Sequence, residues 1–245
     1  MSADPDGVPD PGTRDEQPRR RRWRGLSGVL RETILIVGSA LVLSLLIKTF
    51  LAQAFFIPSA SMQDTLVEGD RVVVSKLSPG MFDLDRGDIV VFRDPDGWLG
   101  PAGVPETSRP ILTEVLTFVG LLPPDAGEHL IKRVIGLPGD RVACCDAAGR
   151  IEVNSSPIVE PYLKPGSVPS EFGFDVVVPP ERLWVMGDNR QNSQDSRAHL
   201  GEPGGGMVPI DDVVGRAVVV MWPLDRLAVL RNPSATFARV PDPEP

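Results

Sequence analysis

A long apolar segment near the N-terminus limits what this chain can fold into. Residues 33–57, TILIVGSALVLSLLIKTFLAQAFFI, carry Lys48 as their only charge, and Pro58 follows them. In an α-helix each residue adds about 1.5 Å, so about 24 residues cross a hydrocarbon core of ~30 Å. The long stem of Lys48 can carry its charge to the far interface. We therefore predict one transmembrane helix over residues 33–57.

Arginine residues precede this segment and predict its orientation across the membrane. Arg19 to Arg22 and Arg24 surround Trp23 just before the apolar residues. Segments rich in Lys and Arg stay on the cytoplasmic side of a membrane. We therefore expect the N-terminus inside the cell and everything after Pro58 outside the cytoplasmic membrane. Residues 1–32 are predicted to be a cytoplasmic tail that contains the arginine cluster, and disordered because it begins with residues rich in Pro, Asp and Gly.

A cleaved leader is the main alternative to an anchor. Ala52-Gln53-Ala54 resembles the small-residue site at which a signal peptide is cut. Such a leader, however, would have a very long, partly acidic N-terminal region and a lysine just before the cut. The paired arginines also allow a twin-arginine export signal, which Trp23 and Arg24 fit poorly. We expect an uncleaved anchor.

Short β-branched runs separated by Gly, Pro and Asp follow the apolar segment. Five of them are typical of strands: residues 71–75, 88–92, 131–135, 150–153 and 216–221. Since no long helices alternate with these runs, a parallel sheet is not expected. We predict a mainly β, antiparallel domain of Greek-key or barrel-like character over residues 58–232, with one N-terminal transmembrane helix.

Two further segments are expected to lie outside this regular framework. Residues 94–128 are predicted to be an insertion. Within it, residues 111–122 are apolar but too short to cross a membrane, so a buried or interfacial helix is expected there. Residues 233–245 are predicted to be a disordered C-terminal tail.

Charge and cysteine content exclude some classes of partner. The formal net charge of -8 disfavours nucleic acid as the main partner. The two cysteines, Cys144 and Cys145, are adjacent, and only His129 and His199 could join them as soft ligands, so no metal site is expected. Neighbouring cysteines can form a strained disulfide or remain thiols. The sequence favours neither state.

One lysine and one serine are candidates for nucleophilic chemistry. Lys132 lies inside the strand-like run IKRVIG, where alternation turns it to the same face as Val134. Burial there would lower its pKa from ~10.4 towards the 7–8 useful to a general base. Ser61 lies in IPSASM, directly after the predicted anchor. Both residues also have an ordinary structural interpretation. Lys132 could be a solvent-exposed lysine on an edge strand, and Ser61 could belong to a turn that ends the helix.

A third candidate element is the polar segment 187–197. It places two aspartates and two arginines within a loop after a further predicted strand, residues 183–186, and such groups can form an ion-pair network that fixes the loop. Exposed pairs of this kind contribute only ~0–1 kcal/mol each, so their use would be positioning. A fixed loop could place Ser193 against the lysine amine.

These elements, in this order, resemble bacterial type I signal peptidase (leader peptidase), a family with a Ser/Lys dyad. The resemblance is carried by PSASM at 58–62, RGDIVVFR at 86–93, IKRVIGLPGD at 131–140, GDNRQNSQDSR at 187–197 and VGRA at 214–217. It implies that Ser61 is the nucleophile and Lys132 the general base. It also implies that the Ser61 N–H and the Ser59 hydroxyl form the oxyanion hole.

The resemblance also implies supporting roles for residues of segment 187–197. Ser193 would orient the lysine, and Asp195 would support that serine. The remaining charged residues of the motif are expected to be structural: Asp188, Arg190 and Arg197. Departures from the family pattern are the long Gly-Glu-Pro-Gly-Gly-Gly stretch, the expanded segment 94–128 and the adjacent cysteines.

The implied activity is removal of signal peptides from exported preproteins at the outer face of the cytoplasmic membrane. The substrate would have small residues at its -1 and -3 positions and would bind as a strand along a sheet edge. No metal or organic cofactor is expected, and membrane lipid is the second expected partner. Two alternatives remain: a Ser/Lys self-cleaving regulator, and an inactive membrane-anchored β scaffold that binds exported chains.

Overall fold

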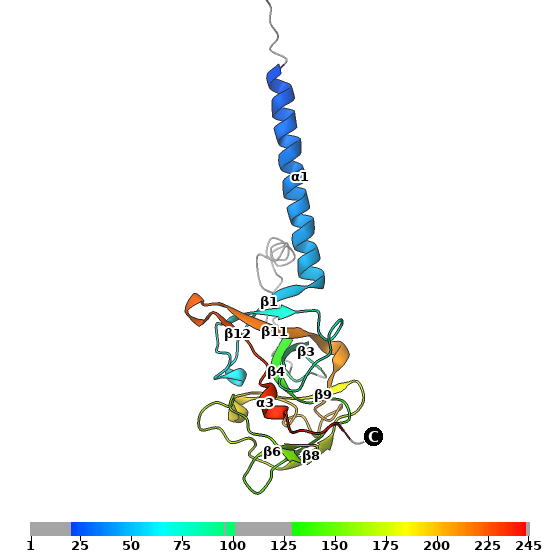
Figure 1. Ribbon diagram of the computed structural model, residues 1–245, viewed down its shortest axis with the longest axis vertical. Helices are drawn as coiled ribbons and strands as arrows, with labels where there is room; N and C mark the ends of the chain where they lie inside the picture. Colours follow the sequence, from blue (N-terminus) through cyan, green and yellow to red (C-terminus); the bar gives the residue numbers. More distant parts are fainter. Residues whose placement is uncertain (1–20, 96, 101–128, 244–245) are drawn as a thin grey trace, which may run out of the picture. The chain divides into compact units, whose positions relative to one another are not determined.

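The computed structural model describes residues 21–95, 97–100 and 129–243 of the 245-residue chain (Figure 1). It divides into two units, residues 1–43 and 44–245. The predicted helix at 111–122, most of the predicted insertion at 94–128 and the first 20 residues of the predicted tail lie outside the described residues.

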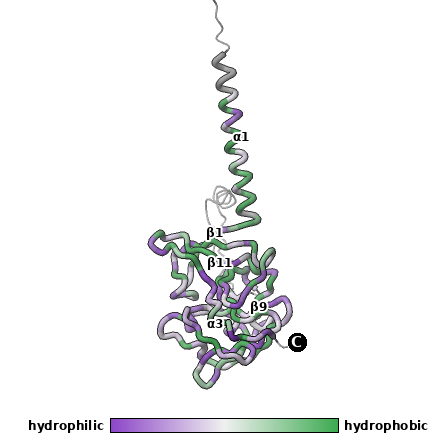
Figure 2. The backbone as a smooth tube through the Cα atoms, in the orientation of Figure 1, coloured by the Kyte–Doolittle hydropathy of each residue, from purple (hydrophilic) through white to green (hydrophobic). Residues whose placement is uncertain are grey.

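Helix α1, Arg21–Phe50, contains a span that is long and apolar enough to cross a membrane. This span, Gly28–Ile47, has a mean hydropathy of 2.0, and much of it is coloured as hydrophobic in Figure 2. The predicted boundaries, 33–57, were wrong at both ends. The helix begins within the segment predicted as disordered, because arginine is a good helix former. It ends at Phe50, because residues 52–56 pair with another strand.

Eight antiparallel strands form the larger sheet (Figure 1). Its order is β1-β2-β11-β3-β4-β9-β10, and β12 pairs with β11. The bounds are β1 Ala52–Phe56, β2 Arg71–Ser75, β3 Ile89–Arg93, β4 His129–Gly136, β9 Arg182–Met186, β10 Val208–Pro209, β11 Val213–Trp222 and β12 Ala228–Val229. The prediction of a mainly antiparallel β domain is confirmed.

A smaller antiparallel sheet has the order β7-β6-β5-β8. Its strands are β5 Arg141–Cys144, β6 Ile151–Val153, β7 Ser156–Pro157 and β8 Phe174–Val177. Cys144 and Cys145, at the end of β5, form a disulfide. Short helices occupy several connections: η1 Ala60–Met62, η4 Arg190–Asn192, η5 Ile210–Asp212, η6 Leu224–Arg226 and α3 Ser234–Phe237.

The middle of the larger sheet is buried on both faces. Successive residues of a strand point to opposite faces, and in β3 both sets are covered. Ile89 and Val91 belong to one apolar cluster, with Phe55 and Met62, whereas Val90 belongs to a second one. This explains why β3 is apolar over four successive residues, and why seven of the eight residues of β4 are buried. A lysine in the centre of β4 is consequently buried.

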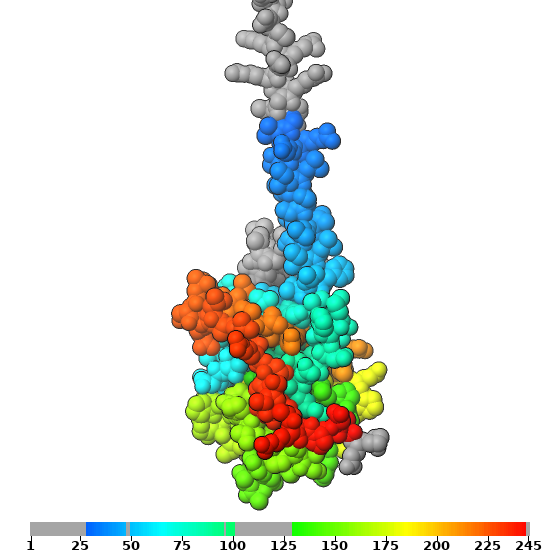
Figure 3. All heavy atoms as spheres, viewed as in Figure 1, coloured from blue at the N-terminus to red at the C-terminus, as the bar shows by residue number. Residues whose placement is uncertain are grey.

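The C-terminal segment is ordered, so the predicted disordered tail at 233–245 was wrong for the described residues up to 243. Phe237 of α3 is buried in the cluster that contains Trp184. Thr236 donates a hydrogen bond to the Val159 carbonyl. In Figure 3 the C-terminal segment lies against the part of the chain that forms the smaller sheet. The two apolar residues Phe237 and Val240 pack against that cluster and hold the segment in place.

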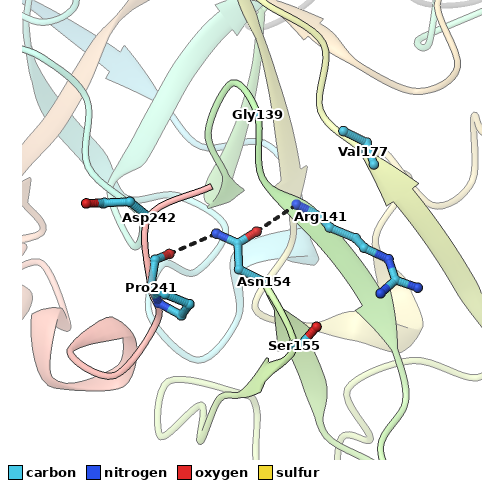
Figure 4. A pocket seen from close by; sticks show the side chains of 7 residues that line it. All are labelled: Gly139, Arg141, Asn154, Ser155, Val177, Pro241 and Asp242. Carbon is cyan, nitrogen blue, oxygen red and sulfur yellow. Dashed lines mark hydrogen bonds between the residues drawn. The ribbon is translucent and has the colours of Figure 1, made fainter. Parts of the chain in front are cut away.

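A polar pocket lies where the C-terminal segment meets the smaller sheet (Figure 4). The Asn154 side chain donates to the Pro241 carbonyl at 2.9 Å and accepts from the Arg141 N–H at 2.8 Å. Its amide also donates to the buried Asp140. Asn154 therefore ties the C-terminus to the turn that leads into β5.

Candidate active site

Lys132 is placed in the buried centre of β4 by the register of the sheet. It lies opposite Val90 of β3 and is 4% exposed. Burial lowers its pKa to about 8; Asp195 and Asp188 act in the opposite direction, and Arg197 lowers it further. A lysine with this pKa carries a substantial neutral fraction near neutral pH. Lys132 therefore loses its proton far more readily than an exposed lysine, which suits a general base.

Ser61 lies in the short helix η1, directly after β1. The buried side chains Ile57 and Met62 anchor the turn on both sides of it. Backbone hydrogen bonds between Ile57 and the residues 69–70 close the loop that contains η1. Lys132 Nζ donates a hydrogen bond to Ser61 Oγ at 2.7 Å, across 71 residues of sequence. The two residues predicted to form the dyad are thus brought together.

Ser59 is the residue on the exposed side of this turn. Its backbone is extended, and its Oγ lies 3.4 Å from Ser61 Oγ. Ser61 itself is only 5% exposed. Because the Ser59 hydroxyl reaches both solvent and the Ser61 oxygen, it can donate to a group that is bound against Ser61.

The segment after β9 surrounds the dyad with buried hydrogen bonds. Asn189 donates its N–H to the Ser61 carbonyl and its side-chain amide to the Ala60 carbonyl, both at 3.0 Å. Asp188 accepts from Arg133 at 2.8 and 2.6 Å, and also from Thr65. These contacts join the Ser61 turn, strand β4 and the end of β9 into one unit.

Asp195 and Arg197 form the second buried ion pair of this segment. Arg197 donates to both Asp195 oxygens, at 2.9 and 2.8 Å, and to the Arg190 carbonyl. Asp195 also accepts the Gly187 N–H at 2.9 Å. Burial alone would raise the pKa of Asp195, but the Arg197 guanidinium outweighs it and the pKa is lowered. Asp195 therefore carries a negative charge that faces Lys132.

Ser193 lies beside the dyad but does not make the expected contact. Its hydroxyl is buried and makes no hydrogen bond to Lys132 among the described residues, but it lies near enough to Asp195 to help lower the pKa of that carboxyl. It packs instead against Gly187, where a Cβ would lie 2.2 Å from Ser193 Oγ and 2.5 Å from the Ser61 carbonyl oxygen. Only glycine allows the backbone to pass between these two serines.

Sequence reasoning missed several residues that hold the site. Arg133, Thr65 and Asn189 contact it directly, and Glu160 pairs with Arg190. Arg133 and Asn189 stand next to predicted residues inside the quoted motifs, which is the signal that could have found them. Thr65 and Glu160 lie outside every motif, and no local pattern indicates their partners.

The chemistry available is that of a hydroxyl next to an amine. The described residues at 21–95, 97–100 and 129–243 contain no group of three His, Cys, Asp or Glu side chains that could hold a metal ion. A buried lysine within hydrogen-bond distance of a serine hydroxyl can activate it as a nucleophile. This arrangement suits acyl transfer through a covalent serine intermediate.

Comparisons with known proteins agree with this chemistry. The family model for signal peptidase, peptidase S26, matches residues 30–222. Signal peptidase I of Mycobacterium tuberculosis (strain CDC 1551 / Oshkosh) is 39% identical over 226 residues, covering 83% of this chain and 76% of its own length. Signal peptidase I of Leptolyngbya laminosa is 37% identical over 233 residues, covering 95% and 98%.

A crystal structure of a signal peptidase I from Enterococcus faecalis V583 is 22% identical, with a TM-score of 0.35, and its match covers 55% of this chain and 96% of that one. The family match spans the anchor, the serine turn, β4 and the segment after β9. The chain therefore belongs to the signal peptidase family, peptidase S26, and is a serine endopeptidase.

Proposed function

We propose that this protein removes N-terminal signal peptides from exported preproteins, with Ser61 as nucleophile and Lys132 as general base. The observation that carries the proposal is the 2.7 Å contact between Lys132 Nζ and Ser61 Oγ inside a buried site. The family match over residues 30–222 supports the substrate class. The named relatives are signal peptidases I.

The proposed reaction begins with Lys132 in its neutral form. The amine takes the Ser61 proton while Ser61 Oγ attacks the carbonyl carbon of the peptide bond to be cut. The resulting oxyanion would accept hydrogen bonds from the Ser61 N–H and the Ser59 hydroxyl. Lys132 then gives its proton to the leaving amine, and the C–N bond breaks. A water molecule, deprotonated by Lys132, hydrolyses the ester on Ser61 and restores the enzyme.

The surrounding residues have positioning roles in this proposal. Asn189 ties the Ser61 turn to the end of β9, and Asp195 fixes the Gly187 N–H. Ser193 packs against Gly187 beside Ser61. We expect Ser193 to orient the lysine amine once substrate occupies the site, since catalytic hydrogen bonds often tighten only then. Asp188, Arg190 and Arg197 support the segment through buried ion pairs.

Membrane anchorage follows from α1 and from family membership, and we propose that the catalytic unit works at the outer face. The arginines before the span favour an inside N-terminus. The end of β11, strand β12 and the connection between them present an exposed apolar surface suited to contact with lipid. Its exposed side chains are Met221, Trp222, Leu224, Leu227 and Val229. Strand β1, which has a single sheet neighbour, follows α1 directly and is an edge at which an extended substrate could pair.

A cleavage assay tests the proposal. The full chain is purified in detergent and incubated with a preprotein that carries small residues at positions -1 and -3. We expect the wild type to release the mature protein and Ser61→Ala to release none. A wild type without activity on any preprotein would refute the proposal. Cleavage confined to the enzyme's own chain would favour a self-cleaving regulator, and binding without cleavage would favour a scaffold.

A further inference from the structure

The segment between β7 and β8 reaches across to the active site. Although it belongs to the smaller sheet, the Lys164 N–H donates to the Asp188 carbonyl at 3.1 Å. The Pro169 carbonyl accepts from Arg190 at 3.0 Å. Two further residues of this segment, Glu160 and Tyr162, lie close to the charged residues around the dyad. None of the sequence motifs includes them.

Glu160 holds Arg190 through a two-point ion pair. Arg190 donates from Nη1 to Glu160 Oε2 at 3.0 Å and from Nη2 to Oε1 at 2.5 Å, and the two side chains are 1% and 2% exposed. A bidentate pair fixes the plane of the guanidinium. Its third nitrogen, Nε, then donates to the Gly187 carbonyl at 2.9 Å. Glu160 therefore fixes the orientation from which Arg190 contacts the main chain of the site.

The peptide groups on either side of Gly187 decide the spacing between Ser61 and Ser193. Its N–H is held by Asp195 and its carbonyl by Arg190. Its Cα is so close to both serines that no side chain fits there. A small rotation of this backbone would therefore displace Ser193 or the Ser61 turn.

Tyr162 connects this ion pair to the neighbouring one. Its hydroxyl donates to Glu160 Oε1 at 2.8 Å, and the Arg133 guanidinium lies 4.0 Å from the centre of its ring. Arg133 in turn pairs with Asp188. The tyrosine thus orients Glu160 and covers Arg133 at the same time.

Glu160 also balances the buried charge of Arg190. Three ion pairs surround the site: Arg133 with Asp188, Arg190 with Glu160, and Arg197 with Asp195. Their charges cancel, so a neutral Lys132 leaves the cluster without net charge. Asp195, Asp188 and Arg197 face Lys132 itself. Loss of the Glu160 charge would leave one guanidinium unbalanced in a region of low dielectric constant.

We propose that Glu160 and Tyr162 are positioning residues of the active site, which hold Arg190 against Gly187 and balance its buried charge. This inference rests on the proposed Ser61/Lys132 function. It assigns to the smaller sheet the role of bracing the Ser61–Ser193 geometry. Neither residue touches the reacting atoms.

The test compares Glu160→Gln with Glu171→Gln, an exposed residue of the same segment that loses the same charge. Cleavage of a preprotein by the full chain in detergent is measured over a range of pH, and kcat and KM are determined for each variant. For Glu160→Gln we expect kcat to fall about tenfold with KM within about twofold of the wild type. The acid limb of kcat/KM should move to lower pH by about half a unit, because an added positive charge disfavours the lysine ammonium. Glu171→Gln should match the wild type.

Two conservative variants separate position from charge. Glu160→Asp keeps the charge but not the reach, so we expect a lower kcat with the acid limb unmoved. Tyr162→Phe removes a single hydroxyl and should lower kcat about threefold to tenfold, also with the limb unmoved. Should Glu160→Gln fail to fold, wild-type kcat in both conservative variants would overturn the inference.

Two outcomes distinguish this inference from the proposed function. If wild type is active and Ser61→Ala is not, but Glu160→Gln behaves as Glu171→Gln does, the positioning role is wrong and the peptidase mechanism stands. The positioning role is equally wrong if the acid limb of Glu160→Gln moves to higher pH. If Ser61→Ala retains wild-type activity, the proposed function itself fails.

Discussion

The buried pair of Asp188 and Arg133 should contribute strongly to stability. Both side chains are at most 2% exposed, and Arg133 donates to the Asp188 oxygens at 2.8 and 2.6 Å. Burial alone would lower the pKa of Arg133, but Asp188 raises it above its ordinary value, so the guanidinium stays charged. Asp188→Ala would leave this charge buried without its counterion. Breaking a buried pair in this way costs about 3–5 kcal/mol.

The assay is thermal unfolding of the full chain in detergent, followed by tryptophan fluorescence, to which the buried Trp184 contributes. For a domain of this size the loss corresponds to a midpoint lower by about 6–20 °C. The matched control is Asp175→Ala, which breaks the exposed pair with Arg141. That variant should leave the midpoint almost unchanged. Equal midpoints for the two variants would refute the reasoning.

Three further predictions concern the reaction and the C-terminus. The neutral form of Lys132 is the active one, so kcat/KM should be half-maximal near the Lys132 pKa of about 8, level off about one unit above it and fall about tenfold per unit below it. A profile that stays flat down to pH 6 would exclude this base. Ser59→Ala should lower kcat about 10²–10³-fold with little change in KM, measured on a preprotein, whereas an unchanged kcat would remove Ser59 from the oxyanion hole. Phe237→Ala should destabilise the fold by about 3–5 kcal/mol in denaturant unfolding, because its ring is buried beside Trp184; a loss below 1 kcal/mol would mean that the segment is loosely held.

Local patterns predicted the strands well and the ends of the chain poorly. The five β-branched runs correspond to β2, β3, β4, β6 and β11, since period and composition act within a few residues. The end of α1 depends on the pairing of Ala52–Phe56 with β2, which is not local. Likewise, the order at the C-terminus depends on the packing of Phe237 into the cluster that contains Trp184. Hydropathy along the chain contains no information on either contact.

The sequence allowed most residues of the site to be named, but only some of the contacts between them to be predicted. Strand alternation gave a reason for a buried Lys132, and the resemblance gave Ser61 as its partner. The expected hydrogen bond of Ser193 to the lysine is not formed, and the Ser193 side chain packs against Gly187 instead. Glu160 could not be found, because its ion pair with Arg190 joins segments 30 residues apart.

Preprotein cleavage by Lys132→Met tests the central mechanism most directly. Methionine fills a similar buried volume and lacks the amine that lies 2.7 Å from Ser61 Oγ. We predict that kcat/KM falls by about 10³-fold or more, while the unfolding midpoint shows that the variant is folded. Turnover within tenfold of the wild type would show that Ser61 does not depend on Lys132 and would contradict the mechanism.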